Sequence, residues 1–284
     1  MMSHLPSLVL VFIFSLSSLS TQVSILESNH LGRAHYRVET LTATYLYDPV
    51  AGGFSSILDP DGNDWVAYKD KPWGEYPAAA AASFRGLPNL VFQGDDDGAG
   101  HPGHRKCSSQ FNNNQIFTQS ISGKWAWTWT FHEKYASLEV TDTDAERPYW
   151  FLYEGPAGGR YRPKQTSWGT DKSGPNYERF DHFKGSKHSD NYRWFYFNGP
   201  DSPYTFWMAQ AEADTLSDHY SLLGSEEKGV DSADGMVVAG FGRGISADPQ
   251  LTGPNTFLIG FYKKQVSTRS RHRAIGRAIR KLLR

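Results

Sequence analysis

Hydrophobic and polar residues alternate with a period of two over most of this chain. From Trp125 to Phe131 an aromatic residue takes every second position, and alanine or threonine lies between. Successive side chains of a strand point to opposite faces of its sheet. The pattern therefore predicts an antiparallel hairpin with two buried rows, the first formed by Trp125, Trp127, Trp129 and Phe131 and the second by Ala136, Leu138 and Val140.

The same alternation, interrupted by Gly-, Pro- and Asn-rich turns, predicts further strands along the chain. They are expected at residues 35–48, 54–58, 147–155, 192–199, 204–213, 235–243 and 256–264. The turn 59–63 predicts a hairpin that joins residues 54–58 to residues 64–69. Residues 23–265 are thus expected to form one all-β domain, a large antiparallel two-layer β-sandwich.

The two ends of the chain break this pattern. Leu8–Ser20 is an apolar run of signal-peptide length, too short to span a bilayer comfortably, although no Lys or Arg precedes it. We interpret residues 1–22 as a signal peptide, which predicts a secreted, periplasmic or cell-envelope protein. The alternative is a buried N-terminal strand.

The C-terminal segment, residues 266–284, is predicted to be a basic amphipathic tail. Its apolar residues recur at helical spacing among seven Lys and Arg residues, and it contains no acid. Such a helix can contact an anionic membrane surface or a partner, and a solvated extension is the alternative. The formal net charge of the whole chain is −1, so the body is acidic, which argues against nucleic acid as a partner.

Three short motifs resemble the opening of galactose mutarotase-like β-supersandwich domains. They are GGFSSILDPDGNDWVAY, SFRGLPNLVF and HPGH, and the resemblance covers residues 45–261. It implies a sandwich fold and an action on sugars, since members include epimerases, polysaccharide lyases, accessory domains of hydrolases and inactive binders. In the epimerases a His/Glu pair on facing strands transfers protons, but the motifs align neither residue here.

The loop GDDDGAGHPGHRKC is the first candidate for chemistry. We interpret His101 and His104 as catalytic proton carriers and Arg105 as a substrate-binding donor. No metal and no cofactor is predicted, although Asp95, Asp96 and Asp97 make Ca²⁺ an alternative without the spacing of an EF-hand. The equal alternative for this loop is an ordinary solvated turn without a chemical role. Cys107 is the single cysteine, so no internal disulfide exists, and we expect its thiol to be buried.

A second group of candidates follows the strand 147–155. Glu154 closes that strand, and a carboxylate there can project into a cleft. The loop aromatic and basic residues beyond it offer stacking surfaces and donors for a sugar. The predicted site therefore adds Glu154 and His188 as catalytic residues and, as substrate-binding residues, Arg160, Tyr161, Trp168, His182, Tyr192 and Arg193.

These residues predict a secreted carbohydrate-binding protein whose ligand is a poly- or oligosaccharide. If it is an enzyme, it would be a cofactor-independent lyase, epimerase or hydrolase that uses His, Tyr and Arg. The rival hypotheses are a non-catalytic glycan-binding module and a structural envelope protein tethered by its basic tail. The saccharide proposal requires residues 101, 154 and 188 to meet on one concave surface.

Overall fold

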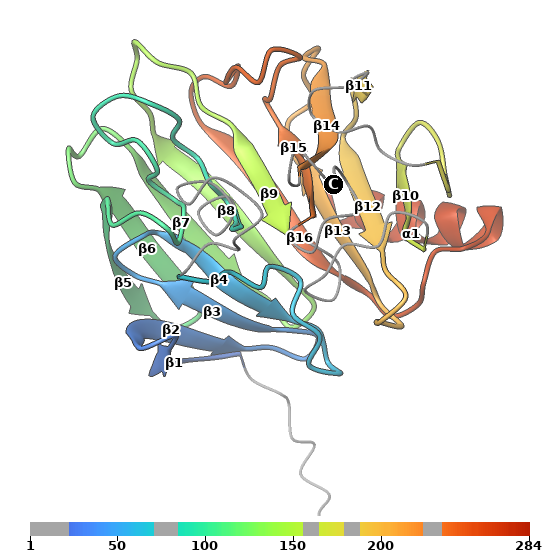
Figure 1. Cartoon of the computed structure of the whole chain (residues 1–284), viewed down its shortest axis with the longest axis horizontal. Coiled ribbons are helices and arrows are strands. Elements are labelled where there is room, and N and C mark those ends of the chain that lie inside the picture. The colour runs from blue at the N-terminus through green and yellow to red at the C-terminus, as the bar shows by residue number, and fades with distance from the viewer. Residues whose placement is uncertain (1–22, 71–84, 156–164, 179–187, 224–234) are drawn as a thin grey trace, which may run out of the picture.

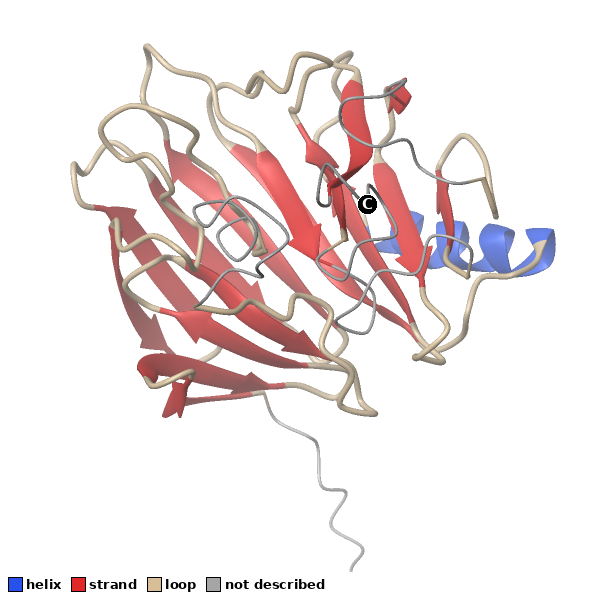
Figure 2. Ribbon diagram, in the orientation of Figure 1, coloured by secondary structure: helices blue, strands red, loops and turns tan. Residues whose placement is uncertain are grey.

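The computed structural model describes residues 23–70, 85–155, 165–178, 188–223 and 235–284. Within these residues the chain forms sixteen strands and a single helix (Figures 1 and 2). All strand pairs of the three sheets are antiparallel. The predicted all-β antiparallel sandwich is therefore confirmed.

One layer is an eight-stranded sheet that crosses the whole molecule (Figure 1). The Trp-rich hairpin lies near one edge of it, and the strands that follow residue 165 extend the sheet at the other edge. In spatial order its strands are β10 (Ser167–Thr170), β12 (Trp194–Asn198), β13 (Thr205–Gln210), β16 (Asn255–Tyr262), β8 (Tyr135–Asp142), β7 (Ala126–Phe131), β6 (Gln115–Ser120) and β5 (Cys107–Asn112).

Two four-stranded sheets form the facing layer. The first contains β1 (Ser24–His30), β2 (Arg33–Glu39), β3 (Thr44–Asp48) and β4 (Gly53–Leu58). The second has the order β11 (His188–Asp190), β14 (Asp218–Leu223), β15 (Met236–Phe241) and β9 (Phe151–Gly155). Both pack on the eight-stranded sheet, since Phe54 contacts Trp129 with ring centroids 4.8 Å apart and Tyr153 contacts Phe206 at 5.1 Å.

The segment 86–90 joins the two smaller sheets into one layer. Its Leu87 carbonyl accepts a hydrogen bond from Phe54 of β4 at 2.7 Å. On its other side, Gly86 and Glu154 exchange two backbone hydrogen bonds of 2.8 and 3.0 Å, and the Pro88 carbonyl accepts from Leu152. The segment thus lies between β4 and β9 and satisfies backbone groups of both.

The predicted buried rows are confirmed. Trp125, Trp127, Trp129 and Phe131 are each at most 1% exposed, and so are Ala136, Leu138 and Val140. The hairpin predicted over 54–69 is wrong in its second arm. After the single bridge between Leu58 and Asp64, the Asp64 carboxylate accepts hydrogen bonds from the backbone of Val66 and Ala67, and the chain turns instead of forming a strand.

Cys107 is buried, as expected, and begins β5. Burial raises the pKa of its thiol to about 12. A Cβ on Gly52 would lie 2.8 Å from Sγ, which shows how tightly the thiol is enclosed.

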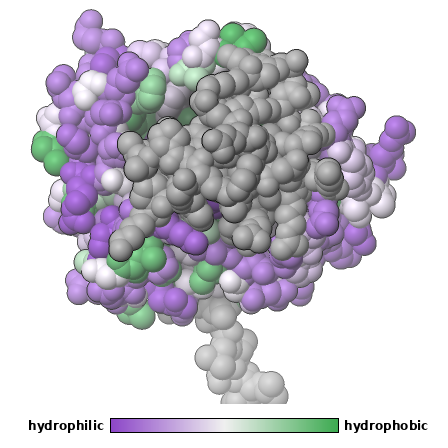
Figure 3. Space-filling view, viewed as in Figure 1, coloured by the Kyte–Doolittle hydropathy of each residue, from purple (hydrophilic) through white to green (hydrophobic). Residues whose placement is uncertain are grey.

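The described part of the surface in Figure 3 is mostly hydrophilic, and its hydrophobic residues lie in scattered spots.

The C-terminal helix α1 (Arg269–Leu282) packs on the outer face of the eight-stranded sheet. Thr268 caps its first turn, accepting a hydrogen bond from the Arg271 amide at 3.3 Å. The apolar stripe predicted from the sequence faces the protein, because Ile275 and Ile279 are buried against Trp194 and Leu258. Among the described residues no helix is both long and apolar enough to cross a membrane.

We expect α1 to contribute to the stability of the whole domain. Replacing Ile279 by alanine should lower the free energy of unfolding by about 2–4 kcal/mol, because a fully buried branched side chain is lost beneath the helix. Urea denaturation measures the change. The matched control is Arg277→Ala on the exposed face of the same helix. Equal effects of the two substitutions would show that the helix adds nothing to the core.

Candidate functional site

Glu154 occupies a buried position on β9. Side chains alternate along the strand, so Tyr153 enters the core between the layers and Glu154 points to the opposite face of the sheet. Its register partners are Val238 of β15 on one side and Gly86 of the joining segment on the other. Glu154 is 5% exposed, so its carboxyl group is almost entirely removed from water.

Asn89 holds this carboxyl group directly. The side-chain amide of Asn89 donates a hydrogen bond of 2.6 Å to Oε2 of Glu154. Asn89 can reach it because the backbone turns sharply there, with φ of 48°, a left-handed value that asparagine tolerates better than most residues. The joining segment therefore supplies both a backbone partner and a side-chain partner to Glu154.

Arg243 is the charged neighbour of Glu154. It follows β15, is 7% exposed, and donates a hydrogen bond of 3.2 Å from Nη1 to Oγ of Ser221 on β14. The backbone amide of His219 donates to the Arg243 carbonyl at 2.8 Å and fixes the chain at that point. Burial lowers the pKa of the guanidinium, while the nearby Glu154 opposes that change.

Burial determines the protonation state of Glu154. Loss of water raises the pKa of its carboxyl group to about 8, and the charge of Arg243 and the amide of Asn89 limit the rise. At neutral pH the group therefore carries a proton for most of the time. A neutral carboxylic acid that can lose its proton beside a fixed cation is suited to acid–base chemistry.

His101 packs against the joining segment at Gly86, the register partner of Glu154. A Cβ on Gly86 would be 3.4 Å from Cδ2 of His101, so this edge of the ring faces the residue that is paired with Glu154. Nδ1 accepts a hydrogen bond from the amide of Gly103 at 2.9 Å. The ring is 2% exposed, and burial, together with the neighbouring His104, holds the pKa of His101 well below its usual value.

These contacts define the tautomer of His101. Because Nδ1 is an acceptor and the ring is neutral, the proton lies on Nε2. Nε2 is buried and makes no hydrogen bond to the described residues. A buried N–H without an acceptor costs about 1–3 kcal/mol. We call Glu154, Asn89, His101, Ser221 and Arg243 together the Glu154 cluster.

Asp218 is a second buried carboxyl group in the same small sheet. Its Oδ1 accepts a hydrogen bond of 2.5 Å from the amide of Gly242, and burial raises its pKa to about 8. Burial raises the pKa of the Tyr192 hydroxyl, and the nearby Asp218 carboxyl group raises it further. This hydroxyl donates to the Gly240 carbonyl at 2.7 Å. Asp218 is thus a second carboxyl group of this sheet that burial keeps mostly protonated at neutral pH.

The three candidate residues of the loop 94–107, His101, His104 and Arg105, differ in how they relate to the Glu154 cluster. His101 belongs to it, and the ring of His104 stands edge-to-face against His101 with centroids 5.3 Å apart. His104 is half-buried and packs beside Gly98, whereas Arg105 is exposed. His101 and Glu154 thus both lie against the joining segment at Gly86.

The third neighbourhood, at residue 188, lies farther along the same sheet. His188 pairs in register with Tyr220 of β14, and β15 then separates β14 from β9 (Figure 1). At a spacing of about 4.8 Å per strand, its backbone is on the order of 14 Å from β9. The side chain of His188 lies outside the described residues, as do all of Arg160, Tyr161 and His182.

The remaining predicted substrate-binding residues have other surroundings. Trp168 was assigned to a loop, but it lies in β10, is 5% exposed and packs on Phe195 and Tyr220. The indole N–H of Trp168 donates to the Glu178 carbonyl at 3.0 Å. Tyr192 is 2% exposed in the core. The Arg193 guanidinium donates to the Ala211 carbonyl, and its backbone amide donates to the Asp171 carboxylate at 3.1 Å. Neither partner belongs to the Glu154 cluster.

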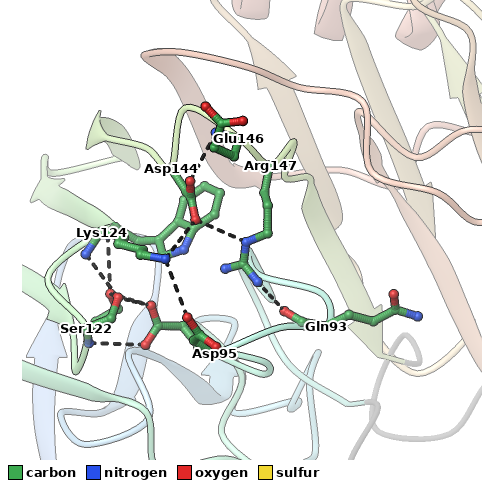
Figure 4. A network of polar contacts seen from close by, with 10 residues as sticks. Gln93, Asp95, Ser122, Lys124, Asp144, Glu146 and Arg147 are labelled. Carbon is green, nitrogen blue, oxygen red and sulfur yellow. Dashed lines mark hydrogen bonds and ion pairs between the residues drawn. The ribbon is translucent and has the colours of Figure 1, made fainter.

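The three consecutive aspartates of the first loop do not converge. Asp95 is exposed and lies 3.4 Å from Nζ of Lys124 (Figure 4). Asp96 is buried and accepts hydrogen bonds from Ser120 and Ser122, while Asp97 accepts from the amide of Gln93 at 2.6 Å. Across the described part of the chain, no group of three or more His, Cys, Asp or Glu side chains is placed to hold a metal.

Three members of the cluster were missed by the sequence reading. Asn89 stood inside the quoted RGLPN motif but received no role there. Arg243 is a single cation that follows an apolar strand in the sequence. A charged side chain in such a position is buried only if it has a partner of opposite charge or hydrogen bonds, so the position was a sequence signal for a buried polar site. Ser221 carries no sequence signal at all. Its position depends on the register of β14 against β15, where it pairs with Val238.

Comparison with solved structures identifies the fold. YeaD from Salmonella typhimurium, described as a mutarotase candidate, superposes with a TM-score of 0.53 at 9% identity over 88% of this chain and 96% of that chain. HI1317 superposes with a TM-score of 0.52 at 10% identity over 87% and 98%. A galactose mutarotase-like protein from Lactobacillus casei gives 0.49 at 9% identity over 80% and 100%.

The chain therefore has the galactose mutarotase-like fold, and the resemblance read from its short motifs is confirmed at that level. No protein-family model and no curated protein matches the sequence. At 9–10% identity the structural likeness concerns the fold alone. Any activity has to be argued from the residues of the Glu154 cluster.

Proposed function

We propose that this protein is a carbohydrate-active enzyme that moves protons on a bound saccharide without an organic cofactor. The Glu154 cluster would be its reaction centre. The observation that carries the proposal is the buried carboxyl group of Glu154, whose pKa is raised to about 8 beside the buried Arg243. The galactose mutarotase-like fold supports sugars as the substrate class, since a neighbour with this fold is described as a candidate mutarotase.

Each member of the cluster takes a definite role in this proposal. Glu154 donates its proton to a sugar oxygen and takes a proton back in the next step. Arg243 stabilises the carboxylate that exists between the two transfers, and Asn89 keeps the carboxyl group oriented. His101 donates from Nε2 to a second sugar oxygen and polarises it. This revises the first expectation, in which histidine carried the proton.

The neutral state of His101 supports that revision. A base or acid that works near neutral pH needs a pKa near the working pH, and burial moves the pKa of His101 well below 6.5. Glu154 has the better matched value. The enzyme would then resemble those sites in which a neutral imidazole polarises an oxygen while a carboxyl group transfers the proton.

A substrate screen in deuterated water tests the proposal. Purified protein would be incubated with neutral and uronate-containing mono-, oligo- and polysaccharides. Interconversion of anomers or epimers, followed by NMR, would assign an epimerase or mutarotase. Unsaturated ends that absorb ultraviolet light would assign a lyase. Saccharide binding with no turnover would instead favour the non-catalytic glycan-binding module.

The place of action is a further part of the proposal. We propose that the protein is exported, on the basis of the apolar segment 8–20, which lies outside the described residues. Its substrate would then be an extracellular or envelope saccharide. Secretion of a fusion that carries residues 1–22, compared with a fusion that lacks them, measures this directly.

A further inference from the structure

A groove with apolar walls lies on the outer side of the eight-stranded sheet, away from the Glu154 cluster. Helix α1 forms one wall with Ile275, Ala278, Ile279 and Leu282. The other wall comes from the sheet and its turns, and it contains Leu41, Pro60, Tyr135, Tyr204, Trp207, Phe261 and Tyr262. The cavity volume is about 790 Å³, within the range of about 300–1,000 Å³ typical of sites for small ligands.

The fold explains why this surface is apolar. Residues alternate along β13, so Phe206 and Met208 enter the core between the layers and Trp207 points outward to the helix. Trp207 packs flat enough on β16 that a Cβ on Gly260 would lie 2.8 Å from its ring. Leu282 and Leu41 border the groove and are 39% and 47% exposed, so apolar surface remains open to water there.

The charged side chains that line the groove are lysines. Within the described part of the chain, the charged residues that line it are Lys134, Lys263 and Lys281, and all three are exposed. Burial raises the pKa of Tyr204 at one wall, and the nearby Asp61 and Asp59, which do not line the groove, raise it further. The lysines come from the turn before β8, the segment after β16 and the last turn of α1. A ligand with an apolar body and a negative end would bury its body against the aromatic wall and place its charge among the lysines.

We propose that this groove binds a free single-chain anionic amphiphile, such as the carboxylate of a medium-chain fatty acid. A saccharide fits it less well, because the lining offers lysines, Thr42 and tyrosine hydroxyls but no carboxylate or carboxamide to accept from sugar hydroxyls. A flat membrane surface also fits less well, because the apolar surface is recessed between the helix and the sheet. The site is independent of the proposed sugar chemistry.

Quenching of tryptophan fluorescence by brominated dodecanoate tests the proposal on the full chain. The acid is used below its micelle concentration, and bromine in the groove should quench Trp207. The quenching should disappear in Trp207→Phe, while calorimetry still detects binding. Each methylene removed from the chain should weaken binding about fourfold. The uncharged dodecanol serves as the probe of equal chain length, and it should bind more weakly.

Matched variants of α1 locate the ligand. Lys281→Gln should weaken binding of dodecanoate about three- to fivefold, as expected for one exposed ion pair, and Arg273→Gln on the other side of the helix should not. Ala278→Phe should fill the groove and weaken binding by about tenfold or more, whereas Arg273→Phe should leave it unchanged. Positions 273, 278 and 281 are exposed, so none of these changes disturbs the core.

Four results would overturn the proposal. The first is the absence of quenching at all chain lengths. The second is equal affinity for dodecanoate and dodecanol, unaffected by Lys281→Gln. The third is binding to anionic phospholipid vesicles without binding of monomeric dodecanoate, which would make the surface a membrane contact. The fourth is a dimer in sedimentation that dissociates in Ala278→Phe, which would make the groove an interface between two copies.

Discussion

Replacing Glu154 by glutamine is expected to lower saccharide turnover by about 10²- to 10⁴-fold, the usual contribution of a positioned acid–base group. Glutamine has nearly the same shape and still accepts the hydrogen bond from Asn89, but it cannot lose or gain the proton. Saccharide affinity should therefore change little. Steady-state kinetics and calorimetry on the same preparations separate the two quantities.

Two controls make this result specific. Glu139→Gln changes an exposed glutamate of β8 and should leave turnover unaltered. In the wild-type protein, a rate that depends on protonated Glu154 should fall as the pH rises through about 8, and that decline should vanish in the residual activity of Glu154→Gln. Full activity in Glu154→Gln would remove Glu154 from the reaction and end the proposal for this cluster.

Stability should decrease with pH more steeply than in most proteins. Burial raises the pKa of both Glu154 and Asp218 to about 8 in the folded state, whereas in the unfolded chain the two groups titrate near pH 4. Their contribution to stability is thus fully present below about pH 4 and is lost as the pH rises through 8. The double variant Glu154→Gln/Asp218→Asn keeps both groups neutral at every pH.

We expect the double variant to gain stability over the wild type as the pH increases. Between pH 5 and pH 9 the gain should grow by about 4 kcal/mol for each buried group, measured by urea denaturation at a series of pH values. The pair Glu139→Gln/Asp142→Asn, which changes two exposed residues of β8, is the matched control and should show no such trend. A difference that is constant with pH would show that neither carboxyl group is protonated in the native state.

The sheets were predictable because their signal is local. The stripe from Trp125 to Phe131 alternates strictly, and each of its positions is buried as the period of two requires. The pattern gave a wrong prediction at Asp64, whose side chain binds backbone amides and turns the chain after one bridge. It also missed the strand at Trp168, because the residues around it in the sequence are typical of a loop.

The candidate site was predictable only in its separate pieces. Glu154 and His101 stood out as a strand-end carboxylate and a histidine in a Gly-rich loop. Their proximity depends on the joining segment, whose Gly86 pairs with Glu154 through contacts 68 residues apart in the chain. Arg243 and Ser221 join them through the register of β14 and β15. Sequence periodicity carries no information about such long-range pairing.

The buried thiol of Cys107 can report how often the structure around it opens. Cys107 is enclosed at the start of β5 and its pKa is about 12, so a maleimide can react only after the surrounding structure opens. The rate of alkylation in native buffer would then report how often the sandwich opens around β5. Bound saccharide or bound amphiphile would slow that rate in proportion to its affinity, which offers a label-based assay for ligands before any enzymatic product is known.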